Sequence, residues 1–270
     1  MRINTNVNGM IATNQMAKNT ALAGASMEKL STGLRITKAA DDAAGLAVSE
    51  KMRAQIRGME QADRNVQDGI SMVQTAEGGL EEAGNIAQRM RELAVQGGND
   101  TLSSTDRSKI KGEMDQLQSE MQNIAEETSF NGNKLLDGSN TAGFKIQAGA
   151  NDEVRTIKTA DLSSIAKSLS KLDVTNNTNA KASIKTIDKA LEDINSARAD
   201  LGAMQNRLDY TSSNLNTSDE NLTAAESRIR DVDVAKEMVN LSKLNILTQA
   251  SQAMVSQAKQ QPEQVTQLLR

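Results

Sequence analysis

Two ladders of apolar side chains at seven-residue spacing, one in each half of the chain, constrain the fold most. Their members are Met52, Met59, Val66, Val73, Leu80, Ala87 and Ala94, and then Ile187, Ile194, Leu201, Leu208, Leu215, Leu222 and Ile229. A seven-residue repeat sustained over this length is typical of coiled-coil packing between long helices. Each ladder would extend roughly 63 Å at 1.5 Å per residue. We therefore expect a mainly α fold, an elongated antiparallel coiled-coil bundle formed by the N- and C-terminal segments.

Antiparallel packing of the two ladders also gives a register. We expect the numbers of facing residues to sum to about 281, because that sum aligns the apolar positions of the two repeats. Val73 would then lie near Leu208, and Ala94 near Ile187.

The composition excludes most catalytic chemistry. Aromatic residues make up 1% of the chain, so a thick globular core lacks its usual large side chains. No histidine and no cysteine occurs, which removes imidazole bases, thiolate nucleophiles, disulfides and the common zinc ligands. The net charge of -4 comes from interspersed signs and leaves no basic stripe for nucleic acid. We expect no enzymatic activity, no cofactor, no metal, no nucleic-acid partner and no membrane partner.

The remaining segments also have local signals. We expect an N-terminal helix to about residue 34, a linker at 35–41 and a long helix that Asp41 or Asp42 caps. That helix should end at residues 97–100, and a second amphipathic helix follows through Ile110 and Ile124. Residues 144–148 and 154–157 alternate around a glycine-rich turn, which indicates a small β-hairpin. Residues 158–180 have no clear pattern.

Both ends of the chain carry uncharged stretches, at residues 3–17 and 244–258. Helices exposed to water usually carry charges on the outer face. We therefore expect these segments to be buried among neighbouring subunits after assembly, and a poorly ordered terminus is the alternative. No segment has the apolar length of a cleaved secretory signal or a membrane span. The candidate assembly residues are Ile3, Val7, Met10, Ile11, Leu244, Ile246, Leu247, Met254, Val255, Leu268 and Leu269.

Several longer motifs resemble one family. At the N-terminal end they are Met1-Arg2-Ile3-Asn4-Thr5-Asn6, Leu30-Ser31-Thr32-Gly33-Leu34-Arg35-Ile36 and Ala40-Asp41-Asp42-Ala43-Ala44-Gly45-Leu46-Ala47. At the C-terminal end they are Asn221-Leu222-Thr223-Ala224-Ala225-Glu226-Ser227-Arg228-Ile229-Arg230-Asp231 and the stretch from Gln261 to Arg270. These blocks resemble the two signatures of bacterial flagellin, the subunit of the flagellar filament. The resemblance is to a short form that lacks large variable outer domains.

The resemblance implies a domain plan. Residues 1–40 and 231–270 would be the N- and C-terminal arms of an inner coiled-coil core domain. Residues 41–140 and 181–230 would form a rod-shaped helical domain, and residues 141–180 a β-hairpin with a short variable segment.

The resemblance also implies a function and a set of partners. The chain would self-assemble into a helical homopolymer, the propeller used for motility, after export by the flagellar type III apparatus. It would thus be a secreted protein of the extracellular bacterial flagellum. Its other partners would be an export chaperone at the C-terminal segment, flagellar cap proteins and hook-associated proteins.

One recognition site follows from the family as well. Receptor-stimulating flagellins are bound by a vertebrate Toll-like receptor at a segment that matches Gln88-Arg89-Met90-Arg91-Glu92-Leu93 here, together with a glutamate on the next helix. The matching positions are Arg89, Leu93 and Glu113. The same residues would make lateral contacts in the filament, so the receptor would recognise the monomer.

Two other classes of protein stay open as alternatives. A hook-filament junction protein shares the terminal scheme, although the 41–47 block and the C-terminal ending favour the filament subunit. A chemoreceptor-type signalling coiled coil also uses long antiparallel helices, but it turns at a tight tip and needs membrane helices.

Overall fold

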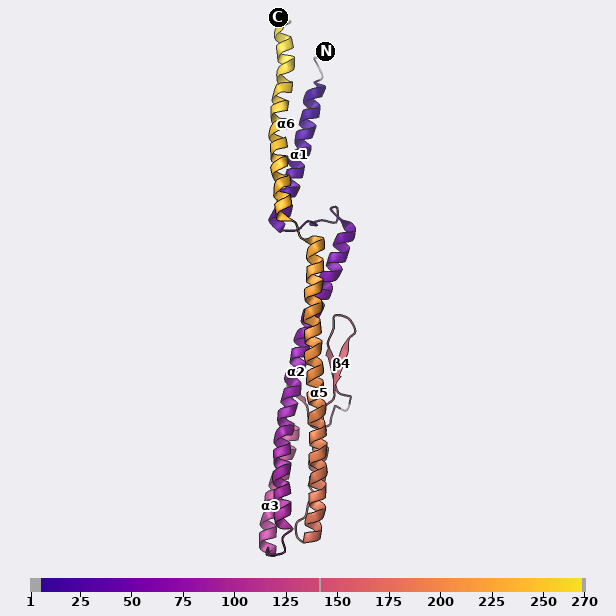
Figure 1. Ribbon diagram of the computed structural model, residues 1–270, viewed down its shortest axis with the longest axis vertical. Helices are drawn as coiled ribbons and strands as arrows, with labels where there is room; N and C mark the ends of the chain where they lie inside the picture. Colours follow the sequence, from indigo (N-terminus) through magenta and orange to yellow (C-terminus); the bar gives the residue numbers. More distant parts are fainter. Residues whose placement is uncertain (1–5, 141, 269–270) are drawn as a thin grey trace. The chain divides into compact units, whose positions relative to one another are not determined.

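The computed structural model describes residues 6–140 and 142–268, with side chains as far as residue 260 (Figure 1). The described residues form two compact units. We call residues 55–220 the central unit, and the residues on either side of it the terminal unit. The mainly α fold is confirmed, and the elements are α1 (Val7–Thr32), α2 (Ala43–Gly97), α3 (Ser104–Glu127), β1 (Ser129–Phe130), β2 (Asn133–Lys134), β3 (Phe144–Gln147), β4 (Val154–Ile157), α4 (Leu162–Leu169), α5 (Asn177–Arg230) and α6 (Val234–Leu268).

The heptad ladders form the core of the central unit, where α2 and α5 run side by side (Figure 1). From residue 59 to 94 and from residue 187 to 215, every ladder side chain is at most 8% exposed. The outer members of the ladders, Met52, Leu222 and Ile229, lie in the terminal unit and are only half-buried. Helix α3 adds Met114 and Met121 to the core, both nearly fully buried.

The antiparallel direction of α2 and α5 is confirmed, but the register differs from the expected sum. A methyl group placed on Gly84 would lie 3.8 Å from Cγ2 of Ile194, whereas the expected register puts residue 197 there. Arg91 pairs with Asp188 through Nε and Oδ1 at 2.6 Å. The helices are thus shifted by about one turn at most at these points. Such a shift is compatible with the sequence because a slip of three or four residues moves one apolar heptad position onto the next.

The predicted β-hairpin is confirmed. Strands β3 and β4 pair antiparallel, with Phe144 opposite Ile157. The hairpin lies directly on α2 because α2 carries glycine where the hairpin meets it. A methyl group on Gly58 would come within 2.9 Å of Cβ of Ala150, and one on Gly69 would come within 2.2 Å of Cδ1 of Ile146.

Helix α4 lies in the segment that has no clear pattern in the sequence. The Asp161 carboxylate caps its first turn by accepting a hydrogen bond from the Ser164 N–H at 2.8 Å. Its buried face consists of Leu162, Ser163, Ala166 and Leu169 and packs on α3. The second strand pair, β1 and β2, is joined by Asn131 and Gly132, both at positive φ.

In the terminal unit, α1 packs along α6 (Figure 1). Gly33 ends α1 in the left-handed conformation, at φ 72°. The chain then meets the end of α5, where Leu34 pairs with Asp231 and the Arg35 N–H donates to the Arg230 carbonyl at 2.6 Å. Of the two predicted caps for α2, Asp42 is the one that accepts from the first turn, from the Gly45 N–H at 2.9 Å.

Candidate functional site: the paired terminal helices

The seam between α1 and α6 is narrow and partly polar. Asn19 and Ser26 on α1 are 4% and 7% exposed, and Leu241 on α6 is 8% exposed. The Asn19 amide donates to the Ser251 hydroxyl at 3.3 Å. Small and polar side chains therefore make most of the buried contacts between α1 and α6. Little of the large apolar surface of the two helices is buried in this seam.

Eleven large apolar side chains of these two helices instead face outward. Their exposed fractions run from 40% for Leu247 to 69% for Val239. The structure shows only four other large apolar residues of its described part as exposed: Val48, Val95, Val154 and Tyr210. The outward set on α1 and α6, which we call the terminal apolar surface, consists of Val7, Met10, Ile11, Leu22, Met27, Val234, Met238, Val239, Ile246, Leu247 and Met254.

A groove of about 440 Å³ runs along this surface between the two helices. Ile11 on α1 and Leu247 and Met254 on α6 supply its apolar lining, and Gln15 and Asn19 its polar part. Apolar surface on this scale in one place marks a site of protein association.

The structure brings most of the predicted assembly residues to this surface. Val7, Met10, Ile11, Ile246, Leu247 and Met254 are exposed on it. Leu244 and Val255 are half-buried. Ile3 and Leu269 lie outside the described residues, and Leu268 belongs to α6 by its backbone only.

The predicted recognition residues lie in the central unit. The Arg89 guanidinium pairs with Glu92 on α2 and with Glu113 on α3, both at 3.0 Å. These hydrogen bonds, first to Glu92 and then to Glu113, raise the pKa of Arg89. Arg89 and Glu113 are about half exposed, whereas Leu93 is only 2% exposed and belongs to the core. Arg89 and Glu113 are thus open to a partner, and Leu93 supports the helix beneath them.

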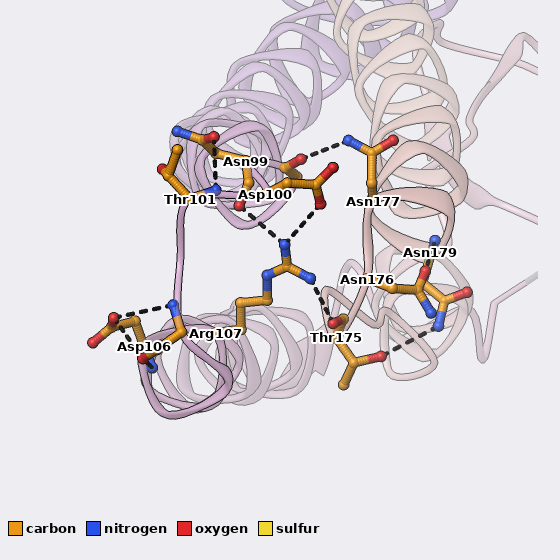
Figure 2. A network of polar contacts seen from close by, with 11 residues as sticks. Asn99, Asp100, Thr101, Asp106, Arg107, Thr175, Asn176, Asn177 and Asn179 are labelled. Atoms are coloured by element: carbon orange, nitrogen blue, oxygen red, sulfur yellow. Dashed lines mark hydrogen bonds and ion pairs between the residues drawn. The ribbon is translucent and has the colours of Figure 1, made fainter.

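A second polar cluster, which the sequence analysis missed, lies at one end of the central unit (Figure 2). The Arg107 guanidinium donates to the Thr175 carbonyl at 2.8 Å and reaches Asp100 at 3.0 Å. The Asn177 amide donates to the Gly98 carbonyl at 2.6 Å. These bonds join the turn after α2 to the loop before α5. Periodicity cannot indicate them, because the acceptors are mostly backbone carbonyls.

The described residues contain no cluster of acidic side chains arranged to hold a metal ion. Within the same part of the chain, no helix is long and apolar enough to cross a membrane.

These features define a class, a helical structural subunit whose paired terminal helices carry exposed apolar side chains. Residues 3–141 match the bacterial flagellin N-terminal helical region, and residues 184–269 match the bacterial flagellin C-terminal helical region. The chain belongs to the bacterial flagellin family.

Relatives of similar length align along the entire chain. The flagellin of Halalkalibacterium halodurans is 53% identical over 274 residues, and that of Bacillus subtilis is 48% identical over 304 residues. Both alignments cover 100% of this chain and 100% of the relative. A flagellar filament core protein of Treponema phagedenis is 45% identical with the same coverage.

Solved structures share the fold. The crystal structure of Bacillus cereus flagellin aligns with a TM-score of 0.51 and 34% identity, covering 60% of this chain and 94% of that one. A putative flagellar hook-associated protein from Vibrio parahaemolyticus aligns with a TM-score of 0.60 over 71% of this chain and 100% of its own. Its identity of 13% makes that likeness one of fold alone.

Proposed function

We propose that this chain is the structural subunit of a bacterial flagellar filament and that α1 and α6 drive its self-assembly. The terminal apolar surface carries the proposal, because a helix pair with small polar residues inside and large apolar residues outside needs further partners. Other copies of the same pair are the natural partners, since contacts repeated between identical subunits generate a helical polymer when the rotation does not close. The proposed role is mechanical and involves no catalysis.

The hook-filament junction alternative has less support. The flagellin relatives are 53% and 48% identical over the full chain, whereas the hook-associated structure is 13% identical. The fold is common to both classes, so only the sequence separates them.

The test is filament growth by purified protein seeded with filament fragments and imaged by electron microscopy. Ile246→Asp adds a charge to the terminal apolar surface, where Ile246 is 66% exposed. We expect this variant to keep its helical content and to stop elongating, because burial of an unpaired carboxylate is costly. Val154→Asp adds the same charge at an exposed apolar position on β4 and should still elongate. Absence of filaments from the unmodified protein would refute the proposal.

The family also suggests the route and the neighbouring partners. We propose export by the flagellar type III apparatus, an extracellular location in the flagellum, and contacts with cap and hook-associated proteins. We place an export chaperone at the C-terminal segment, because α6 presents apolar side chains such as Ile246 and Met254 before assembly covers them. We propose residues 1–40 and 231–270 as the core-domain arms, residues 41–140 and 181–230 as the rod-shaped domain, and residues 141–180 as the hairpin and variable segment. Removal of α6 should abolish chaperone binding in a pull-down experiment.

We further propose that the monomer is recognised by the vertebrate Toll-like receptor that senses flagellin, through Arg89 and Glu113. Their exposed ion pair supports this, because an arginine held in place by a carboxylate is a common interface hot spot. Leu93 would act from the core by holding the α2 backbone in position.

Receptor binding should be measured with purified monomer. We expect Arg89→Ala and Glu113→Ala each to weaken binding by about tenfold or more. The matched control is Arg53→Ala, which removes a comparably exposed arginine of α2 that lies outside the recognition segment and pairs with Glu50. Equal loss in all three variants, or in none, would contradict a specific site at Arg89 and Glu113.

A further inference from the structure

The methionines of this chain divide sharply by exposure. Thirteen occur in the sequence. Those buried to 8% exposure or less all lie in the central unit: Met59, Met72, Met90, Met114 and Met121. Those exposed by 52% to 62% all lie on α1 and α6: Met10, Met27, Met238 and Met254. The other described methionines, Met16, Met52 and Met204, are intermediate.

This division makes the terminal helices the preferred target of oxidants. The chain has no cysteine and no tryptophan, so methionine sulfur is its most easily oxidised group. A peroxide transfers one oxygen atom to the thioether: the O–O bond breaks, an S–O bond forms, and the peroxide is reduced to water while the sulfur loses two electrons. Access of the oxidant to the sulfur decides which methionines react, so the four exposed ones should react first.

The product changes the surface on which assembly depends. A sulfoxide is polar and accepts hydrogen bonds, whereas the thioether packs as an apolar group. The most buried residues of the seam between α1 and α6 are Asn19, Ser26 and Leu241, whereas all four methionines are more than half exposed, with Met254 at the edge of the groove beside Asn19. Oxidation therefore acts mainly on the face offered to other chains, and the buried residues of the seam are not themselves modified.

We infer that Met10, Met27, Met238 and Met254 form a peroxide-sensitive modification site that switches off assembly of the free subunit. The inference rests on the proposed self-assembly of α1 and α6. Burial of a sulfoxide in a contact built for a thioether leaves a polar group without a partner, which disfavours addition of the oxidised subunit. Subunits already assembled are protected, because the same contacts cover the sulfur atoms. Methionine sulfoxide reductases reverse the change.

The first experiment treats purified monomer with hydrogen peroxide and locates the added oxygen by peptide mass spectrometry. Met10, Met27, Met238 and Met254 should be oxidised before the five buried methionines. Seeded elongation should then slow by about tenfold or more, with helical content and thermal unfolding of the central unit unchanged. Treatment with MsrA and MsrB should restore elongation. Elongation at the untreated rate by fully modified monomer would overturn the inference.

A matched variant separates these four sites from general damage. The quadruple variant Met10→Leu, Met27→Leu, Met238→Leu, Met254→Leu keeps an apolar surface and should elongate equally before and after peroxide. An equal loss in this variant would show that other groups are responsible and would overturn the inference. If the variant itself assembles poorly, treatment of the oxidised wild-type protein with MsrA and MsrB still tests the inference, because elongation must recover. Failure of untreated protein to elongate would instead refute the proposed self-assembly.

Discussion

The side chain of Asn6 makes hydrogen bonds to both α1 and α6. Proline has no N–H, so residue 262 of α6 cannot donate the usual helical bond to the carbonyl of Ala258. The Asn6 amide donates to that carbonyl at 2.6 Å. Its side-chain oxygen meanwhile accepts from the Gly9 N–H at 2.9 Å and caps α1. The proline in α6 thus creates the acceptor that holds the start of α1.

Asn6→Asp tests this arrangement, because it keeps the capping oxygen and removes only the donor to Ala258. We expect a loss of about 1 kcal/mol in the pairing of α1 with α6. Faster amide exchange near residue 9 and near residue 258 in the assembled filament would be the measure. In a Pro262→Ala background α6 regains its own hydrogen bond, and the same substitution should cost clearly less. Equal losses in both backgrounds would contradict the role assigned to the proline.

Asp219 is a half-buried residue of α5 in the central unit. Its Oδ1 atom is buried and has no hydrogen-bond partner. Burial first, and the nearby charge of Glu60 second, raise the pKa of Asp219. A carboxyl whose pKa rises on folding penalises the folded state when ionised, and the penalty disappears as the pH falls through the folded pKa.

Asp219→Asn should therefore stabilise the protein at pH 7 by on the order of 1 kcal/mol, since it removes the buried charge. At a pH below the ordinary carboxyl value of 3.8, where Asp219 is protonated in both states, the gain should vanish. Urea unfolding at both pH values gives the comparison. Glu220→Gln, at an exposed neighbouring position, should change stability little at either pH. A gain that is independent of pH would exclude the ionisation as its cause.

At the scale of elements, α2 depends on glycines to let other segments approach it. Gly78 and Gly79 are adjacent in the helix, yet their surroundings differ. Nothing lies within 4 Å of a methyl group placed on Gly78. A methyl group on Gly79 would lie 2.8 Å from Cδ1 of Leu136 and 2.9 Å from Oγ1 of Thr128. Substitution of Gly78 and of Gly79 in turn therefore distinguishes the effect of helix propensity from the effect of packing.

Gly78→Ala should stabilise the protein by about 1 kcal/mol, because alanine favours the helix more than glycine does. Gly79→Ala gains the same propensity but must displace Leu136 and Thr128, and we expect a net loss of about 1 to 3 kcal/mol. Denaturant unfolding of the two single variants measures both effects. Similar gains from the two substitutions would show that the 128–136 segment moves aside without cost.

The sequence predicts those elements whose pattern repeats. The ladders indicate α2 and α5 with their buried faces, and alternation indicates β3 and β4. Helix α4 escapes prediction because its two turns are too short to show a period, and its serine-rich composition resembles a loop. The register is predicted only to within about one turn, because a slip of three or four residues moves one apolar heptad position onto the next. Arg107 is missed because two of its three acceptors are backbone carbonyls, which every residue has.

The candidate site could be predicted only in part. The uncharged stretches at both ends indicate α1 and α6 as the assembly helices, and most of the named residues face outward. Composition does not reveal that the seam between them is polar, because that depends on which face of each helix meets the other. Leu93 shows that a motif alone does not reveal burial. The motif includes Leu93 in the recognition segment, whereas the structure buries it in the core.

At the scale of the whole molecule, the two units differ in how they are stabilised. The central unit buries its large apolar side chains within one chain, as Leu80, Ile194 and Leu208 show. The terminal unit leaves such side chains exposed, so it lacks the burial that would offset the entropy of ordering. Each arm orders roughly 40 residues at about 1 to 2 kcal/mol of backbone entropy per residue. We expect contacts with other copies of the chain to supply the apolar burial that offsets this entropy cost.

Removal of residues 1–40 and 231–270 should therefore leave a folded central unit that cannot polymerise. Its thermal transition by circular dichroism should match the main transition of the full chain, because the buried ladders from residue 59 to 94 and from 187 to 215 remain intact. In the full chain, amide exchange should be fast at residues 3–17 and 244–258 in dilute monomer and slow in the filament. Filament growth by the doubly truncated protein, or strong protection of both stretches in dilute monomer, would show that assembly is not what stabilises α1 and α6.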